Sequence, residues 1–368
     1  MAIALEEILG FSPLTTALRA TSSGVPNPFP DDLFTVAPQN RVRGDRAKWI
    51  RITGERRTAR RVVYGAPGRR RSLRDVSDQT IRCFHNHETF QIEMTVLQKL
   101  QAFEKYENDD GIDWVRYQLE EAAKRQVNTR IITAASMLRQ GAIYWDSDGN
   151  LLPTSSGADT NQTVTANIPS SHQNQLGGLI DASWALANTD IPFHVESIQK
   201  QSLQDTGMRQ NAVMYGINVP RYIRANNFAQ AFMSRNPGMN DKMLTTNAIP
   251  DGLFNIDKWV PVYTSFFQTD DNTVHEIWDD DLAVFMPSIA QPDKMDWWKI
   301  FEGSYPVPRS IDVQRDPMAA IKNFEVVFGQ GAYAIITYDP IGIEVHNFDT
   351  FIPTIRNEKA IYQAEVAF

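Results

Sequence analysis

Only a few side chains in this sequence have types and a spacing that could support chemistry. His85 and His87 flank an asparagine, an arrangement found in one class of metal-dependent nucleases, but the further metal ligands that such a site requires are not evident beside them. We therefore interpret both histidines as polar loop residues. Residues 146–150 read DSDGN and share the first ligands of a calcium loop, yet the Gly and Glu spacing of that loop is absent. A hairpin turn with Asp148-Gly149 at its tip is the better interpretation.

The other candidates for chemistry are two acidic runs and one cysteine. Asp270–Asp271 and Asp279–Asp281 are consecutive acids, and a consecutive run supplies fewer converging metal ligands than a site needs, so we expect solvated turns. Cys83 is the sole cysteine, which excludes an internal disulfide and a multi-cysteine zinc site, and we expect it to be buried. No nucleophile elbow, phosphate-binding loop, dinucleotide motif or HExxH motif is present. The sequence therefore predicts a protein that is not an enzyme, with no cofactor and no bound metal.

The most unusual feature of the chain is a basic segment, Arg41–Arg74. It holds thirteen Arg or Lys residues and two acids, a net charge of about +11, whereas the whole chain carries −8 and the remainder therefore about −19. Such asymmetry indicates that the basic part meets an acidic partner. That partner could be nucleic acid, a lipid surface or another copy of the chain.

The basic segment has the pattern of β-strands. KWIRITG (48–54) and RRVVYG (60–65) alternate in side-chain character, and glycines and Pro67 punctuate them, which predicts a long β-hairpin. An isolated hairpin is marginal in water, so we expect this one to rest on another surface. Before it, residues 1–40 are rich in proline and predict an extended arm lying on the protein.

The rest of the chain predicts a mixture of helices and strands. A helix over 112–140 follows from its apolar spacing and would span about 43 Å, which is long for a globular domain and suggests a structural strut. Further elements are expected as helices at 92–106, 176–188, 194–205 and 221–234 and as strands at 142–152, 212–217, 259–286 and 333–368.

Composition places the chain among ordinary globular proteins. Its 368 residues are 42% hydrophobic and 22% charged, enough for two or three domains. No run approaches 18 apolar residues, so no membrane span is expected. Glu6 and Glu7 make the N-terminus a poor signal peptide, and the single cysteine fits a reducing cytoplasm.

Self-association explains the charge pattern better than nucleic-acid binding does. The basic segment has few aromatic residues for stacking on bases, only Trp49 and Tyr64, and the acidic remainder would repel nucleic acid. A positive arm on the negative face of another copy is a heterologous contact, which repeats into rings or shells.

With these elements in order, the chain resembles the major capsid protein of tailed bacteriophages, in the lambda-type group called phage capsid protein E. The residues that carry the resemblance are the arm PNPFPDDLF, the series HVESIQKQSLQDTG, AVMYGI and NVPRYIRANNFAQAF, and the ending GAYAIITYDPIGIEV with FIPTIRNEKAIYQAEVAF. It covers nearly the whole chain and lies in the order of the elements.

The resemblance implies an α+β fold of the Hong Kong 97 type. Its parts would be an N-terminal arm (1–40), an extended hairpin loop (41–90), a peripheral domain (91–190) with the spine helix 112–140, an axial domain (191–345) and a return to the peripheral domain (346–368).

The resemblance also implies hexamers and pentamers of an icosahedral shell around double-stranded DNA, located in the virion and assembled in the cytoplasm of a bacterial host. A scaffold, a portal and, in some members, a decoration protein would be partners. The hairpin residues expected to contact a neighbouring subunit are Arg51, Arg56, Arg57, Arg60, Arg61, Arg69, Arg70 and Arg71. Two alternatives are an encapsulin-like nanocompartment of the same fold and a nucleic-acid-binding protein with a basic arm.

Overall fold

The computed structural model describes residues 9–25, 27, 29–52, 76–100, 105–174, 178–235, 238–239, 241, 243, 248–262, 266–268, 274–289, 297–308, 324–338 and 341–367, with the backbone alone at 49–52, 76–79, 105–108, 174, 266–268, 338 and 341. Its α-helices are α2 (Phe11–Ser22), α3 (Met94–Leu100), α4 (Lys105–Gln140), α5 (Ile191–Thr206), α6 (Val219–Ala225) and α7 (Asn227–Ser234). Its 3-10 turns are Asp31–Leu33, Pro38–Asn40, Ser170–His172, Leu253–Asn255 and Glu358–Ala360.

The strands lie in two larger sheets and three small ones. They are β1 (Arg41–Val42), β2 (Arg46–Ile52), β3 (Val76–Arg82), β4 (Phe84–Ile92), β5 (Ala142–Trp145), β6 (Leu151–Leu152), β7 (Val164–Thr165), β8 (Gln173–Asn174), β9 (Ala212–Tyr215), β10 (Lys258–Pro261), β11 (Phe266–Gln268), β12 (Val274–Glu276), β13 (Leu282–Met286), β14 (Trp298–Pro308), β15 (Phe324–Tyr338), β16 (Ile341–Ile355) and β17 (Tyr362–Glu365).

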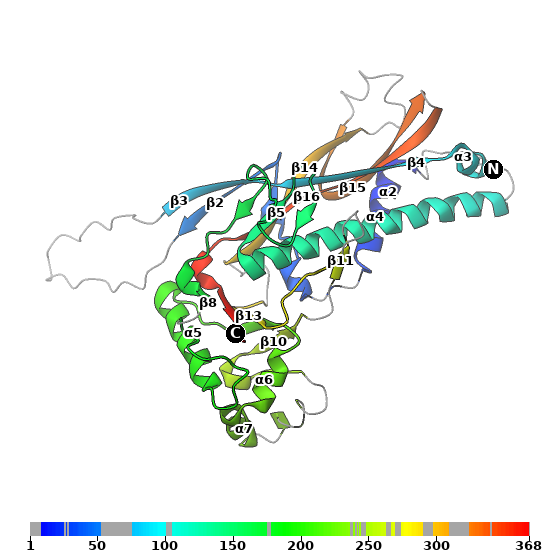
Figure 1. The fold of residues 1–368 in the computed structure, drawn as a ribbon. Coiled ribbons are helices and arrows are strands. Elements are labelled where there is room, and N and C mark those ends of the chain that lie inside the picture. The colour runs from blue at the N-terminus through cyan, green and yellow to red at the C-terminus, as the bar shows by residue number, and fades with distance from the viewer. Residues whose placement is uncertain are drawn as a thin grey trace, which may run out of the picture.

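A 36-residue helix, α4, lies along the first sheet and forms the long axis of the molecule (Figure 1). The sheet has the strand order β1-β14-β15-β16-β4, with a further pairing between β14 and β16. Leu119 and Ala123 of α4 are buried in one cluster with Ile92 of β4 and Val345 of β16. The predicted strut is therefore confirmed. It begins earlier than Ile112, because a polar turn precedes the first apolar residue of the pattern.

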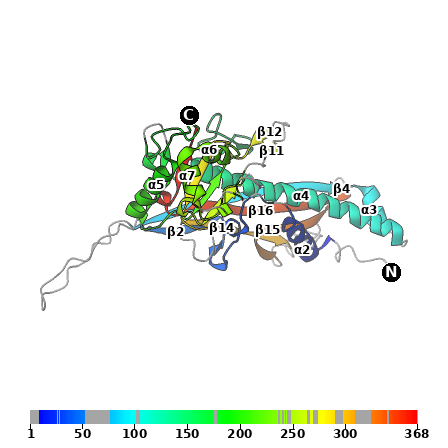
Figure 2. The same cartoon turned by 90° about the horizontal axis from the view of Figure 1, so that it is seen from below.

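The basic segment contains the first strand, β2, of a hairpin that projects from the body. β2 and β3 are antiparallel, from the pair Arg46 and Arg82 to the pair Ile52 and Val76. Both views show them leaving the body at the end opposite the start of α4 (Figures 1 and 2). The predicted strand over 48–54 is confirmed over its described residues, 48–52, within β2. Residues 53–54 and the predicted strand over 60–65 lie outside the described residues.

The second sheet has the order β10-β9-β13-β17-β8 and is flanked by α5, α6 and α7 (Figure 1). Asp190 caps α5 by accepting a hydrogen bond from the Phe193 amide, and Gly207 ends it in the left-handed conformation, at φ 75°. This helix and the strand at β9 are confirmed. The end of α4 and strands of both sheets share one large apolar cluster, so the two sheets belong to one packed body.

The N-terminal arm differs from the extended form that we expected. α2 is helical from Phe11, since Pro13 lies in the first turn, where a missing amide is tolerated. Leu14 and Leu18 are buried against α4 and β15, and the Thr15 hydroxyl donates to the Ala332 carbonyl at 3.0 Å. The arm does lie on the protein, as predicted, but it does so as an integral part of the core.

One predicted helix is wrong and another is interrupted. The described residues 178–188 form turns, because Trp184 is buried there with its amide bonded to the Val366 carbonyl. The helix expected over 221–234 is divided at Asn226, whose side chain accepts from the Ala229 amide and so starts α7.

The two sheets also group the strands differently from the domain ranges expected from sequence. The boundary at residue 345 falls inside β16, and β17 of the C-terminal range lies in the second sheet. Among the described residues, no helix is both long and apolar enough to cross a membrane.

Candidate functional site

The candidate site is the projecting hairpin together with the root that holds it. Of the arginines expected to contact a neighbour, Arg51 lies in β2 with its backbone opposite Ser77. The other seven lie outside the described residues: Arg56, Arg57, Arg60, Arg61, Arg69, Arg70 and Arg71. Their contact role therefore stays a prediction, and what the structure supplies is the anchorage of the hairpin.

The root of the hairpin is tied to β14 by its backbone. The Gly44 amide donates to the Ser304 hydroxyl at 2.7 Å, and the Gly44 carbonyl accepts from the Ser304 amide at 3.0 Å. Gly44 adopts φ 87°, a conformation that favours glycine. The Cys83 amide donates to the Asp45 carbonyl at 2.6 Å and so closes the base of the two strands. These bonds fix where the hairpin leaves the body.

A small apolar cluster completes the root. Ala47 of β2 and Cys83 are buried with Phe301 of β14 and Ile352 of β16. Burial raises the pKa of the Cys83 thiol to about 12, so the thiol stays protonated near neutral pH and is a poor nucleophile. The prediction that this cysteine is buried is confirmed, at 7% exposed.

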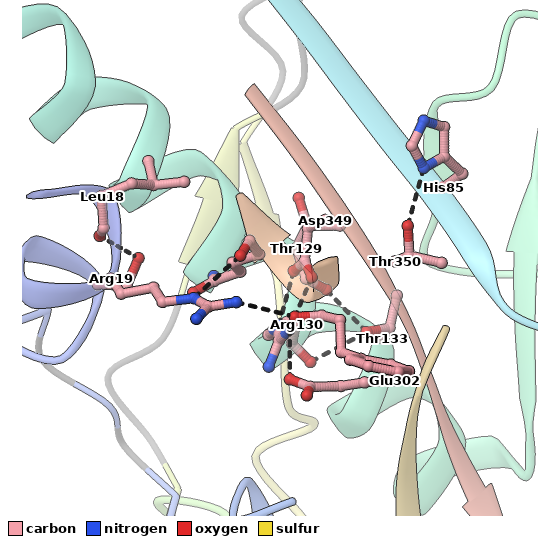
Figure 3. Close-up of polar contacts among 12 residues, drawn as sticks. Leu18, Arg19, His85, Thr129, Arg130, Thr133, Glu302, Asp349 and Thr350 are labelled. Atoms are coloured by element: carbon pink, nitrogen blue, oxygen red, sulfur yellow. Dashed lines mark hydrogen bonds and ion pairs between the residues drawn. The ribbon is translucent and has the colours of Figure 1, made fainter. Parts of the chain in front are cut away.

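Behind the root lies a buried charged cluster that joins α4 to the first sheet (Figure 3). The Arg130 guanidinium donates from Nε and Nη2 to the two carboxylate oxygens of Asp349, both at 2.6 Å, and from Nη2 to Glu302 Oε1 at 3.2 Å. The guanidinium also lies 5.0 Å from the Phe351 ring centroid. Burial by itself would lower the pKa of Arg130, but the two carboxylates outweigh it and raise that pKa, so the side chain remains charged.

Two further arginines, one in the N-terminal arm and one in β1, bind the same sheet. Arg19 of α2 donates to the Gln330 and Phe328 carbonyls of β15, each at 3.0 Å. Arg41 of β1 forms an ion pair with Glu302 at 3.4 Å. The arm, the spine helix and the first sheet thus converge at the point from which the hairpin leaves.

The two histidines at 85 and 87 lie in strand β4, so the interpretation of polar loop residues is wrong. His87 Nε2 and His346 Nδ1 are 3.0 Å apart, and His346 stacks on Tyr333 with ring centroids 4.8 Å apart. His85 stacks on Tyr305 at 4.4 Å. Burial lowers the pKa of all three histidines, and His87 lowers the pKa of His85 and His346 further. They form an aromatic cluster on β4, β14, β15 and β16.

The acidic run at 279–281 lies in a turn with Asp279 and Asp280 exposed, as predicted, but two of its acids have partners. Asp279 pairs with Arg139 Nε at 3.1 Å, and Asp281 accepts from Asn218 Nδ2 at 3.0 Å and from the Tyr222 hydroxyl at 2.8 Å. The run lines a cavity of about 600 Å³ beside the end of α4.

The calcium-like sequence is a hairpin turn, as predicted. Asp146 Oδ1 accepts from the amides of Asp148 and Asn150, and Gly149 has φ 88°. Among the residues that the structure describes, no three His, Cys, Asp or Glu side chains converge in a way that could hold a metal ion.

Comparison with known proteins gives structural matches alone. No protein-family model matches the chain, and no curated protein matches it in sequence. A prophage protein of Escherichia coli CFT073 with a proposed capsid role matches 98% of this chain and 99% of its own at 13% identity and a TM-score of 0.52. A phage-related protein of Bordetella bronchiseptica RB50 matches 98% of both chains at 12% identity and a TM-score of 0.50.

These matches show the fold. The chain has the mixed α+β fold of phage capsid proteins, and the predicted Hong Kong 97-type architecture is confirmed at that level. The lambda-type assignment within it stays a prediction.

Proposed function

We propose that this protein is the major capsid protein of a tailed, lambda-type bacteriophage. It assembles into hexamers and pentamers of an icosahedral head that encloses double-stranded DNA. The observation that carries the proposal is the end-to-end structural match, over 98% of this chain, with a prophage protein that has a proposed capsid role. The subunit acts as a building block of the shell and performs no catalysis.

In this proposal the hairpin makes the contact between neighbouring subunits. The described root rests on β14, β16 and the charged cluster, so the hairpin has a rigid base, and its sequence is strongly basic. Arg51, Arg56, Arg57, Arg60 and Arg61, with Arg69–Arg71, would meet the neighbour. A positive arm and an acidic remainder suit repeated head-to-tail contact.

The domains of the proposed capsid subunit follow the sheets. We keep the arm (1–40) and the hairpin loop (41–90), and we assign the first sheet with α4 to the peripheral domain. The second sheet, with α5, α6 and α7, is the axial domain, which would point towards the centre of a capsomer. A scaffold, a portal and a decoration protein are partners of such shells, which assemble in the bacterial cytoplasm and become part of the virion.

Electron microscopy of the purified full-length chain tests this function. We expect uniform angular shells, or rings of five and six subunits, in negative stain. A chain that stays monomeric and binds DNA tightly in a salt-sensitive manner would overturn the proposal in favour of a basic-arm binding protein. Shells that contain an enzyme in place of DNA would instead indicate the encapsulin-like nanocompartment.

A further inference from the structure

A cavity of about 250 Å³ lies beside the base of the hairpin. Four parts of the chain line it, and they are Thr80 and Ile81 of β3, Met137 of α4, residues 163–167 around β7, and residues 354–356 with Glu358 after β16. A site for a drug-sized ligand is usually larger, about 300–1,000 Å³. This cavity therefore suits a small molecule or one inserted side chain.

One charged donor at this cavity is buried and has no acceptor. Arg356 lines the cavity, and its Nε is buried without a hydrogen-bond partner. Arg130, whose guanidinium is also buried, instead bonds the carboxylates of Asp349 and Glu302. Because a buried charged donor that stays unbonded is destabilising, Arg356 is suited to an acceptor from outside the chain.

Neutral donors from two other elements line the same cavity. The Thr165 hydroxyl donates to Asn167 Oδ1 at 3.3 Å, which orients the side-chain amide and leaves Asn167 Nδ2 as a donor. Thr80 of β3 adds a hydroxyl. The cavity thus combines one guanidinium with an amide and a hydroxyl, a donor set that recognises an oxyanion.

We propose that this cavity binds a carboxylate group, with Arg356 as its main partner and Asn167 and Thr80 as further donors. The planar guanidinium matches a carboxylate through two parallel hydrogen bonds. Glu358 also lines the cavity, and its charge disfavours a dianion such as phosphate more than a singly charged carboxylate. The carboxylate comes from a free small acid or from an Asp or Glu side chain of another polypeptide, since both present the same group.

A bound carboxylate would connect elements that are far apart in the sequence. Arg356 follows β16, Asn167 follows β7 and Thr80 lies in β3, so one ligand bonded to all three joins the hairpin to the body. Ile81 and Val164 of the cavity wall also pack on the apolar cluster of the hairpin root. Because a ligand that binds only the folded chain stabilises it, occupancy stabilises the base of the hairpin. This site does not depend on the proposed assembly into shells.

Saturation-transfer NMR on the full-length chain tests the proposal with three probes. Acetate represents a free acid, and N-acetyl-aspartate N-methylamide presents an Asp side chain between two peptide bonds. N-acetyl-asparagine N-methylamide is the uncharged match of the second probe. We expect saturable binding of a carboxylate probe, and binding of the asparagine compound that is at least about tenfold weaker.

Substitutions at the cavity give effects of opposite sign. Arg356→Met keeps an aliphatic side chain without the charge and should weaken carboxylate binding at least about tenfold, whereas Arg356→Lys keeps the charge without the fork and should give an intermediate loss. Glu358→Gln removes the like charge and should strengthen binding about two- to fivefold. The control Arg221→Met changes an exposed arginine of α6 that does not line the cavity, and it should leave binding unchanged.

The outcomes separate the two sources of the carboxylate and can overturn the site. Tighter binding of acetate supports a free acid, and tighter binding of the aspartate compound supports a side chain of another polypeptide. Binding of neither, or binding that is the same in the unmodified chain, Arg356→Met and Glu358→Gln, would overturn the proposal and leave the cavity to water. Circular dichroism checks the fold of each variant, and the gain expected for Glu358→Gln keeps the test decisive if Arg356→Met does not fold.

Discussion

Arg130 is the residue on which the packing of α4 against the first sheet depends. Its partner Asp349 has a fully buried side chain, at 0% exposed. The carboxylate of Asp349 accepts hydrogen bonds from Nε and Nη2 of the Arg130 guanidinium. Removing one partner of such a pair leaves an uncompensated buried charge, which is far more damaging than the net value of the pair. The cluster therefore fixes the position of the helix on the sheet.

We predict that Arg130→Ala lowers the free energy of unfolding by about 3–5 kcal/mol, measured by urea denaturation. The control is Arg116→Ala on the same helix. Its ion pair with Asp113 is exposed at both ends, so that change should cost less than about 1 kcal/mol. Equal losses for the two variants would show that the buried cluster has no special role.

The histidine cluster predicts a pH-dependent stability. His85, His87 and His346 have pKa values lowered in the folded chain, so the unfolded chain binds more protons as the pH falls through the histidine range. Stability is then fully present above about pH 6.5 and decreases below it. Burial raises the pKa of the neighbouring Tyr333, so its hydroxyl stays protonated throughout this range. The nearby Glu344 favours the charged form of His346 and moderates the effect.

Urea unfolding between about pH 7.5 and pH 5 measures this dependence. The double variant His87→Gln, His346→Gln should flatten the curve, since it removes the two rings that share a nitrogen contact at 3.0 Å. An unchanged slope in that variant would assign the acid sensitivity to carboxylates elsewhere.

At the residue scale, the buried charged cluster was not predicted from the sequence. Arg130 and Asp349 are 219 positions apart, and only the pairing of β16 with its neighbours brings them together. The available signal was weak: Asp349 stands among Phe348, Phe351 and Ile352, and an acid in such apolar sequence requires a buried partner.

At the scale of elements, the hairpin is the part whose role is separable from the stability of its own subunit. Its root is buried, but the basic residues at 56–61 follow β2 in a segment that has few apolar side chains. Charge reversal there should disturb contacts with another copy and leave the core of its own chain intact.

We predict that Arg56→Glu, Arg57→Glu, Arg60→Glu, Arg61→Glu abolishes shells and changes the free energy of unfolding by less than about 1 kcal/mol. The matched control replaces the same four arginines with lysine, which keeps the charge and should preserve shells. A normal yield of shells from the glutamate variant would count against a role in the subunit contact.

Elements with a strong local signal were predicted well. The spine helix has sustained apolar spacing, α5 has an N-cap and a terminal glycine, and the turn at Asp148-Gly149 has the residues that its conformation requires. The helix expected over 176–188 failed because Trp184 is held by Val366 and His194, contacts that no local pattern contains. The arm was predicted to be extended because it is rich in proline. The helical spacing of Leu14 and Leu18 in α2 was not recognised.

At the scale of the whole molecule, two sheets share one core around the end of α4, and the hairpin and the start of α4 lie at opposite ends (Figures 1 and 2). The sequence predicted the class of fold from the order of its elements. It could not predict which strands pair, because β1 and β4 join partners more than 200 positions later, and periodicity carries no information on such distant pairing.

The strand order of the first sheet has a consequence for folding during synthesis of the chain. β4 is an early strand, and its partner β16 ends at Ile355, so a ribosome must synthesise nearly the whole polypeptide before that edge can close. Until then the basic hairpin and the apolar side of α4 are exposed together on an incomplete subunit. Such long-range pairing slows folding and exposes the nascent chain to aggregation. The yield of folded chain is therefore expected to depend on chaperone capacity.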